Sequence, residues 1–144
     1  MIVLDTNVVS ELIRRSPDPA VAAWVADHDA ATLFVTAIGE AELRYGVAIL
    51  PAGRRRKMLA AAVDLMLRED LAGHILPFDS AAAHAYATIA SERRAIGWPA
   101  AQADAQIAAI ARSRGMAVAT RNIKDLQGMG VNLVNPWETP AHQN

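Results

Sequence analysis

No cysteine occurs among the 144 residues of this sequence. That absence excludes disulfide bonds and thiolate metal sites, and it is typical of proteins in the reducing cytoplasm. No apolar run approaches the roughly 18 residues that a membrane-spanning helix needs, and no basic segment precedes the first apolar residues. We therefore expect a soluble, cytoplasmic protein that does not contact a membrane.

Aromatic residues are also scarce, at 5%, and the net charge is only −1. Because 53% of the residues are apolar and many of these are alanine, we expect closely packed helices in a globular chain. The small net charge creates no overall field that attracts nucleic acid, so such binding needs local basic clusters or bound cations. The length suits one domain with a single core, which we place at residues 1–138, followed by a loose tail at residues 139–144.

The first residues combine strand and helix signals around one carboxylate. Ile2-Val3-Leu4 is a run of strand formers that ends at Asp5, and Thr6 and Asn7 can cap a following helix. A buried strand that ends in aspartate places the carboxylate at the carboxyl edge of a sheet, where open α/β sheets bind ligands. A lone aspartate there is more often a cap than a functional group. Other acidic residues must therefore converge on Asp5 for it to act.

Short apolar strands alternate with amphipathic helices along the chain. We expect five strands, at residues 2–4, 33–35, 74–78, 116–119 and 131–134. Between them we expect helices at residues 7–15, 19–28, 36–50, 54–73, 80–97 and 103–115, with Asp18, Thr36 and Asp79 as caps. This alternation predicts a parallel sheet covered on both faces, and right-handed crossovers bring the carboxyl ends of all its strands to one edge.

Glu40 and Glu42 lie on one predicted helix but in different settings. They are separated by about 200° around the helix axis, so they cannot face the same way. Glu40 precedes Arg44 by one turn, which is typical of a solvated surface pair. Glu42 shares a face with Ile38, Tyr45, Gly46 and Ile49. A carboxylate on an apolar face is unexpected, because burying it without a partner is costly.

Asp104 has a similar setting in the first turn of a later helix, on one face with Ile107, Ala108 and Ala111. The helix dipole eases its charge there. An N-terminal charge or cap is the alternative to a functional role, but the alanine and isoleucine face indicates that Asp104 points inward. The loop from Thr120 to Asp125 follows a strand, as Asp5 does, and so lies along the same edge of the sheet.

Asp5, Glu42 and Asp104, with Asn122 or Asp125, thus converge from distant segments on one predicted acidic pocket. Two carboxylates about 4 Å apart repel by roughly 4 kcal/mol at an effective dielectric near 20. Such a cluster must share protons or bind cations, and oxygen ligands suit Mg²⁺ or Mn²⁺. A divalent ion with open positions can activate water and stabilise charge on phosphoryl oxygens. The pattern therefore predicts metal-assisted hydrolysis of a phosphodiester.

One basic run, Arg54-Arg55-Arg56-Lys57, opens a predicted helix. Such a run is more often a solvated helix start than a nucleic-acid patch. Its cations lie at the unfavourable end of the helix dipole, which weakly favours an external anionic partner. We keep both interpretations at this point.

The sequence resembles the PIN-domain nucleases and, within them, the VapC-type toxins of bacterial toxin–antitoxin pairs, including the FitB-like ones. The matching segments follow the family's order over nearly the whole chain: residues 4–8, 41–46, 76–79, 103–104, 107–109, 119–122 and 135–137. The resemblance implies a three-layer α/β/α fold with a central, mostly parallel five-stranded sheet. It also implies an endoribonuclease that depends on Mg²⁺ or Mn²⁺ and arrests growth.

The same resemblance implies the partners. An RNA is the expected substrate, and a cognate antitoxin is expected to inhibit by placing its C-terminal segment in the active-site groove. DNA is expected to be contacted only indirectly, through the antitoxin. A homodimer is the usual assembly.

By residue, Asp5, Glu42 and Asp104 match the acidic triad of the family, which holds the metal ion. Asn122 stands where many PIN domains have a fourth acidic residue, and it cannot carry negative charge. Asp125, one helical turn further on, could replace it. The replacement of the fourth acid by Asn122 weakens the expectation of a second bound metal ion but not of the first.

Hydroxyl groups and cations complete the expected site. Thr6 and Thr120 are expected beside the substrate as supporting hydroxyls, although each can equally be a helix cap. Contact with the substrate strand is expected from local cations, which makes RNA binding sensitive to salt. The nearest candidates are Arg121, Lys124, Arg14 and Arg15.

Two other functions are compatible with these acids. In the first, they are caps and buried pairs, and the protein is a binding module that works only within an antitoxin–DNA repressor complex. The uncharged Asn122 favours this alternative. In the second, the protein is a phospho-acceptor signalling domain. That fold normally needs an acidic pair after the first strand and a lysine after the last, and Asp5 stands alone.

Overall fold

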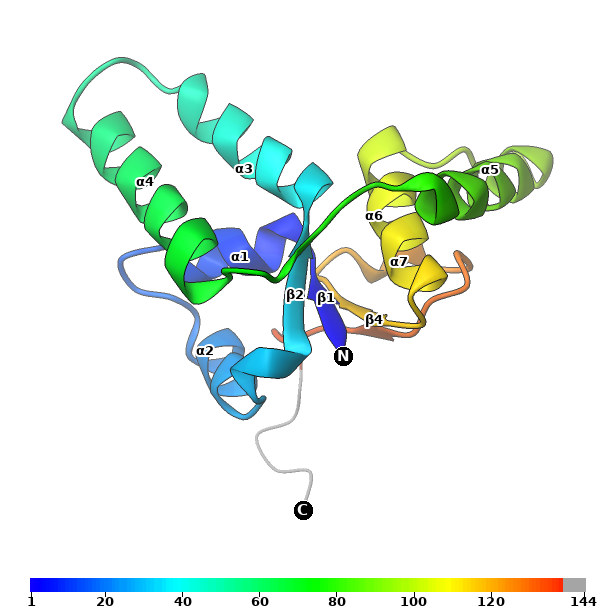
Figure 1. The fold of residues 1–144 in the computed structure, drawn as a ribbon, viewed down its shortest axis with the longest axis horizontal. Helices are drawn as coiled ribbons and strands as arrows, with labels where there is room; N and C mark the ends of the chain where they lie inside the picture. The colour runs from blue at the N-terminus through cyan, green and yellow to red at the C-terminus, as the bar shows by residue number, and fades with distance from the viewer. Residues whose placement is uncertain (139–144) are drawn as a thin grey trace.

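A computed structural model describes residues 1–138 and contains a five-stranded sheet in which every strand pair is parallel (Figure 1). The strands are β1 (Ile2–Leu4), β2 (Leu33–Thr36), β3 (Ile75–Leu76), β4 (Ala117–Ala119) and β5 (Leu133–Val134). This confirms the predicted α/β class with a central parallel sheet. The tail predicted at residues 139–144 lies outside the described residues.

The strands that were predicted longest are shorter in the structure. β3 has two residues where five were expected, because Pro77 follows Leu76 and has no backbone N–H to continue the ladder. β5 ends at Val134, and Pro136 stands two residues further on. Prolines therefore end both outer strands of the sheet.

The helices make up most of the remainder of residues 1–138. They are α1 (Thr6–Leu12), α2 (Pro19–Ala26), α3 (Ala37–Ala48), α4 (Arg54–Leu65), α5 (Ser80–Ala95), α6 (Gln102–Ser113) and α7 (Ile123–Leu126), with short turns η1 (Ala30–Thr32) and η2 (Met66–Asp70). The predicted caps are confirmed, because Asp18, Thr36 and Asp79 each accept a backbone N–H of the first turn that follows.

Two predicted helix ends are wrong. The first helix was expected to reach Arg15 but ends at Leu12, where the Arg14 backbone N–H bonds to the Glu11 carbonyl at 3.2 Å instead of continuing the four-residue pattern of an α-helix. The helix expected to run to Gly73 ends at Leu65, where the chain widens into the π-turn η2.

Side chains of the strands alternate between two cores. Val3 and Val118 pack in the core on the side of α5 and α6, whereas Leu4 and Ala119 pack in the core on the side of α1, α2 and α4. This follows from the two-residue repeat of a strand. Figure 1 shows the two groups of helices on opposite sides of the sheet. The predicted three-layer arrangement is therefore confirmed.

The strand order, β3-β2-β1-β4-β5, reverses beside β1. The chain first builds outward from β1 to β3, and then returns to place β4 on the other side of β1. Helices leave the two neighbouring strand ends in different directions at such a point, which opens a crevice at their carboxyl ends. Asp5 follows β1 and Thr120 follows β4, so both lie at this crevice. Within residues 1–138, no helix is long and apolar enough to cross a membrane.

Arg93 near the end of α5 is a buried cation that ties three segments together. Its side chain is 4% exposed and lies over the ring of Trp98, with 3.7 Å from the guanidinium carbon to the ring centroid. Nε donates to the Trp98 carbonyl at 2.8 Å, and Nη1 donates to the carbonyls of Asp125 and Gln127 at 3.1 and 3.3 Å. The guanidinium thus holds α7 and its flanks against α5.

Replacing Arg93 with methionine keeps most of the side-chain volume and removes these donors. We expect a loss of about 2–3 kcal/mol in the free energy of unfolding, because hydrogen bonds from a charged donor are worth about 1.5–3 kcal/mol and the freed carbonyls lose their partner. Urea unfolding followed by circular dichroism measures this. Arg94→Met, one residue on and exposed, is the control and should change stability by less than about 0.5 kcal/mol. Equal losses of stability at both positions would contradict a stabilising role for the hydrogen bonds of Arg93.

Candidate active site

A groove of about 730 Å³ opens at the carboxyl edge of the sheet. Its lining comes from α1, α3, α4, the first turn of α6 and the loop after β4. Asp5, Glu42 and Asp104 all line it, together with Asn122. The structure therefore brings together the three carboxylates that the sequence predicted to converge.

Asp5 forms the buried floor of the groove, with 4% of its surface exposed. Its backbone N–H donates to the Ala119 carbonyl at 2.9 Å, which continues the pairing of β1 with β4. The side chain caps α1, because Oδ1 accepts the Thr6 backbone N–H at 2.8 Å. Oδ2 accepts the Thr120 hydroxyl at 2.7 Å and the Asn7 amide at 3.4 Å. Asp5 is therefore both a helix cap and a fixed group of the groove.

Thr120 links the loop after β4 to the start of α1. Besides donating to Asp5, its hydroxyl accepts the backbone N–H of Asn122 at 3.0 Å and the side-chain amide of Asn7 at 3.3 Å. Asn7 in turn accepts the backbone N–H of Arg121 at 3.3 Å. Thr120 is fully buried. Its contacts position Asp5 and the loop that carries Asn122, which agrees with the supporting role predicted for this hydroxyl.

Glu42 reaches the groove from an exposed position on α3. The Thr6 hydroxyl donates to Glu42 Oε1, which agrees with the supporting role predicted for Thr6. The apolar face expected around Glu42 does not form a core, because Tyr45 is 67% exposed and Ile49 is 64% exposed. The helical repeat could identify that face but could not show whether another element covers it.

Two carboxyl groups of the site have a raised pKa. Burial raises the pKa of Asp104 to about 6, and the negative charges of Asp5, Asp125 and Glu42 add to the shift, whereas Arg93 acts in the opposite direction. Burial also raises the pKa of Asp5, while the hydrogen bonds from Thr120 and Thr6 oppose that rise. Negative charge therefore outweighs positive charge around Asp5 and Asp104.

Asn122 and Asp125, the two predicted alternatives for a fourth group, have different positions. Asn122 lines the groove, whereas Asp125 is an exposed residue of the short helix α7 and does not line it. Asp125 is still close enough to raise the pKa of both Asp5 and Asp104. Asn122 can offer an oxygen ligand, and Asp125 contributes negative charge from the side.

Within the part of the chain that the structure describes, no group of three or more His, Cys, Asp or Glu side chains is arranged to hold a metal ion. Mg²⁺ does not require such a group, since it retains several waters and is usually bound by one or two carboxylates. The oxygen-only donors and the raised pKa of Asp104 fit a hydrated hard cation that is held partly through water.

The cations predicted to contact substrate divide into two groups. Arg14 and Arg121 line the groove, and the Arg121 guanidinium lies 5.0 Å from the ring centroid of Trp137. Arg15 and Lys124 are exposed but do not line it. Arg15 was expected to continue the first helix, and the early end of α1 at Leu12 changes its direction.

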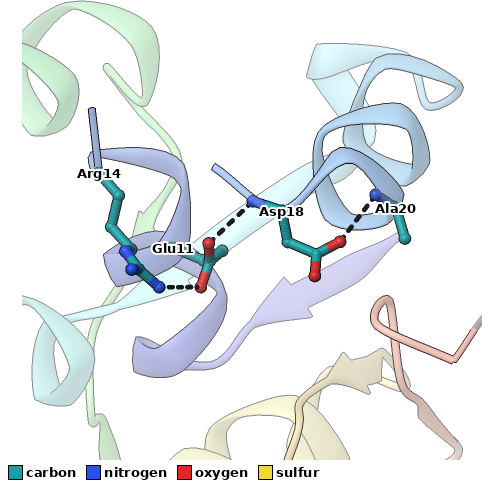
Figure 2. A network of polar contacts seen from close by, with 4 residues as sticks. All are labelled: Glu11, Arg14, Asp18 and Ala20. Carbon is teal, nitrogen blue, oxygen red and sulfur yellow. Dashed lines mark hydrogen bonds and ion pairs between the residues drawn. The ribbon is translucent and has the colours of Figure 1, made fainter. Parts of the chain in front are cut away.

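Several residues of the groove were not predicted, among them Glu11, Arg55 and Trp137. Figure 2 shows that Glu11 accepts from Arg14 at 3.3 Å and from the Asp18 backbone N–H at 2.9 Å, which joins α1 to the start of α2. Glu11 is 6% exposed, so its main role is in this junction. The spacing of Glu11 and Arg14 and the basic run around Arg55 were visible in the sequence, but nothing local placed either at the groove.

Three comparisons place this chain among known proteins. The PIN domain model matches residues 2–127. The VapC ribonuclease Y4jK of Sinorhizobium fredii is 43% identical over 138 residues, which cover 96% of this chain and 99% of that protein. The toxin FitB of Neisseria gonorrhoeae is 39% identical over 137 residues, which cover 95% of this chain and 99% of that protein. The structure of FitAB bound to a DNA fragment matches with a TM-score of 0.90 at 39% identity, over 99% of each chain.

The pKa of Asp104 predicts a pH-dependent stability. A folded-state pKa of about 6, above the ordinary aspartate value of 3.8, means that the folded protein binds more protons between these values than the unfolded protein does. Its stability contribution is therefore present at low pH and is lost as the pH rises towards 6. In metal-free protein, Asp104→Asn should thus become more stable than the wild type as the pH rises from 4 to 7. We expect about 1 kcal/mol, which is discounted because the side chain is half-exposed.

Thermal melting in a chelator at several pH values measures this difference. Asp70→Asn is the control, because it makes the same chemical change at an exposed position outside the groove. A stability difference for Asp104→Asn that stays constant from pH 4 to 7 would contradict the raised pKa.

Proposed function

This chain belongs to the PIN-domain family, with VapC- and FitB-type toxins among its relatives, and from that premise we propose that it is an endoribonuclease toxin. It hydrolyses phosphodiester bonds in RNA and depends on Mg²⁺ or Mn²⁺. The observation that carries the proposal is the convergence of Asp5, Glu42 and Asp104 on one groove from three separate elements. The family resemblance predicted from the sequence is thereby confirmed, and the reaction follows from the chemistry of these residues.

Asp5, Asp104 and Glu42 are the residues that would hold the metal ion, with the Asn122 amide oxygen as a further donor. When bound, a divalent ion lowers the pKa of an attacking water and stabilises negative charge on phosphoryl oxygens. Three hydrogen bonds fix the Asp5 carboxylate, and Oδ1 retains acceptor capacity towards the groove. The hydroxyl of Thr6 orients Glu42. The raised pKa of Asp104 supports cation binding, because a positive charge relieves the repulsion among the acids.

We further propose that the toxin is neutralised by a cognate antitoxin protein, reaches DNA only through that antitoxin, and forms a homodimer. Support comes from the relatives, since the matching FitAB structure is bound to DNA. The outer faces of α3 and α4 also carry exposed large apolar side chains, which are typical of protein interfaces. These are Tyr45, Ile49, Met58 and Leu65.

A second candidate function is a binding module that acts only within an antitoxin–DNA complex. Asn122 supports it, because an uncharged residue lines the groove where the resemblance expects a fourth acid. The lack, among residues 1–138, of a group of three or more such side chains arranged to hold a metal ion supports it as well. The two candidates differ in whether the groove binds a divalent ion and cleaves RNA.

Asp5→Asn and Asp104→Asn should each lower Mg²⁺-dependent RNA cleavage by at least about 100-fold, because each removes a negative charge from the ion's site. Cleavage of a structured RNA by the purified protein, followed on a denaturing gel, measures this. Asp104→Asn is the more secure test, since Asp5 also caps α1 and its loss can affect folding. Glu69→Gln, at an exposed position, should leave cleavage unchanged. Cleavage that survives both substitutions would exclude this site.

Addition of Mn²⁺ should raise the melting temperature of the wild type, because a ligand that binds only the folded state stabilises it. At a concentration 100 times the dissociation constant, the gain is about 2.7 kcal/mol, or roughly 8–10 °C for a chain of this length. Asp104→Asn should lose most of the shift. The absence of any shift at millimolar Mn²⁺ would favour the binding module.

A further inference from the structure

Four consecutive cations, Arg54 to Lys57, form the first turn of α4. Arg54, Arg55 and Lys57 are exposed, and Arg56 donates through Nη1 to the Leu50 carbonyl at 3.4 Å. The ion pairs found within residues 1–138 involve other arginines, and none includes these four. The molecule therefore concentrates four positive charges at one point without neutralising them.

Their position on the helix adds to the repulsion. The N-terminus of a helix carries partial positive charge, so cations there are unfavourable and anions are favourable. Gly53 is the N-cap of α4 and offers no side-chain oxygen to the free backbone N–H groups. An external anion would reduce the repulsion among the four cations and would accept hydrogen bonds from the free backbone N–H groups at the start of α4.

The basic turn belongs to the same groove as the acids. Arg55 lines this groove together with Asp5 and Asp104. The helix α3 forms the wall between them, from Glu42 near the sheet to Leu50 just past its C-terminal end, where Arg56 is bound. Figure 1 shows α3 rising away from the strands and α4 beginning at its far end. Eight residues of helix span about 12 Å.

We propose that Arg55, with Arg54 and Lys57, binds the phosphate backbone of single-stranded RNA at a phosphate beyond the one that is cut. The proposal rests on the proposed function, because it takes the acids as the cleavage site. The wall is about 12 Å long, so a strand must carry more than one phosphodiester group to contact both the acids and the start of α4.

A nucleic-acid strand fits the groove better than an acidic peptide does. At the acidic end, the cluster of Asp5, Glu42 and Asp104 repels a carboxylate and accepts a phosphate only through a bound cation. At the basic end, successive cations match a backbone that carries one charge per nucleotide. A single RNA strand therefore satisfies both ends of the groove, and an acidic peptide satisfies only one.

The test measures RNA binding in the Asp104→Asn background, so that no strand is cut. Fluorescence anisotropy follows a labelled RNA of about twelve nucleotides, a length within the usual range of single-strand sites, as the salt concentration rises from 50 to 200 mM with constant Mg²⁺. Each lost phosphate contact reduces the slope of log affinity against log salt by about 0.7. We expect that reduction for Arg55→Gln, and about three times as much for the triple change at Arg54, Arg55 and Lys57.

Arg68→Gln is the matched control. It removes the same charge from the segment just after α4, but Arg68 is paired with Asp64 at 2.9 Å and does not line the groove. Its affinity and salt slope should equal those of the background protein. Melting temperatures show whether each variant folds. Because cations are unfavourable at a helix N-terminus, we expect the triple variant to melt at the same temperature as its parent or higher. If the triple variant does not fold, the comparison of Arg55→Gln with its parent is sufficient to test the proposal.

Strand length gives a second readout. Arg55→Gln should weaken binding of the long RNA by at least roughly three-fold but leave binding of a dinucleotide unchanged, because its single phosphodiester group cannot contact the acids and α4 together. Equal weakening of both lengths would place Arg55 at the cleavage end and overturn the proposal.

Two further outcomes would overturn it. One is a salt slope for the triple variant that equals that of its parent. The other is unchanged RNA binding with loss of binding to a glutamate-rich peptide, which would make the basic turn a protein-docking surface. Failure of the proposed function is a separate result, namely no Mg²⁺-dependent cleavage by the wild-type protein. Binding and cleavage are measured independently, so the two failures can be distinguished.

Discussion

The hydrogen bond from the Thr120 hydroxyl to the Asp5 carboxylate, 2.7 Å long, is the contact on which the site depends. It joins the carboxyl ends of β1 and β4, the neighbouring strands between which the strand order reverses. Both residues are buried, so the bond acts in a medium where polar contacts are strong and their loss is costly. Through Asn7, the same network orients the backbone of the loop that carries Arg121 and Asn122.

The fold keeps its acids close together although they repel one another, and local structure reduces the cost of doing so. Asp5 caps α1, and Asp104 lies in the first turn of α6, so each carboxylate meets the positive end of a helix. Arg93, buried behind the site, lowers the pKa of Asp104 without pairing with it. The two helix N-termini and Arg93 reduce the repulsion among the carboxylates but do not remove it, and the pKa of Asp104 still lies near 6. Binding of a cation at this site is therefore favourable.

The groove has two ends of opposite charge. Its acidic end is rigid, because it is built from strand ends and first turns of helices around a sheet. Its basic end belongs to α4, which packs mainly against α3 and the other helices of its own layer. The separation of the two ends follows from the length of α3, and this length can select the length of strand that fits between them.

The sequence by itself determined the α/β class, the helix caps and the three acids, because each depends on local residue types or on a periodicity that neighbouring residues carry. The acid after β1 is of this kind. Tertiary structure alone decided which faces are covered, where helices end and which cations reach the groove. Tyr45 lies on a helix face that is apolar in the sequence, yet it is 67% exposed. Arg55 belongs to a basic run for which the sequence left two interpretations open, and the structure places it in the lining of the groove. Burial and proximity depend on the packing of segments far apart in the chain, and no local pattern contains that information.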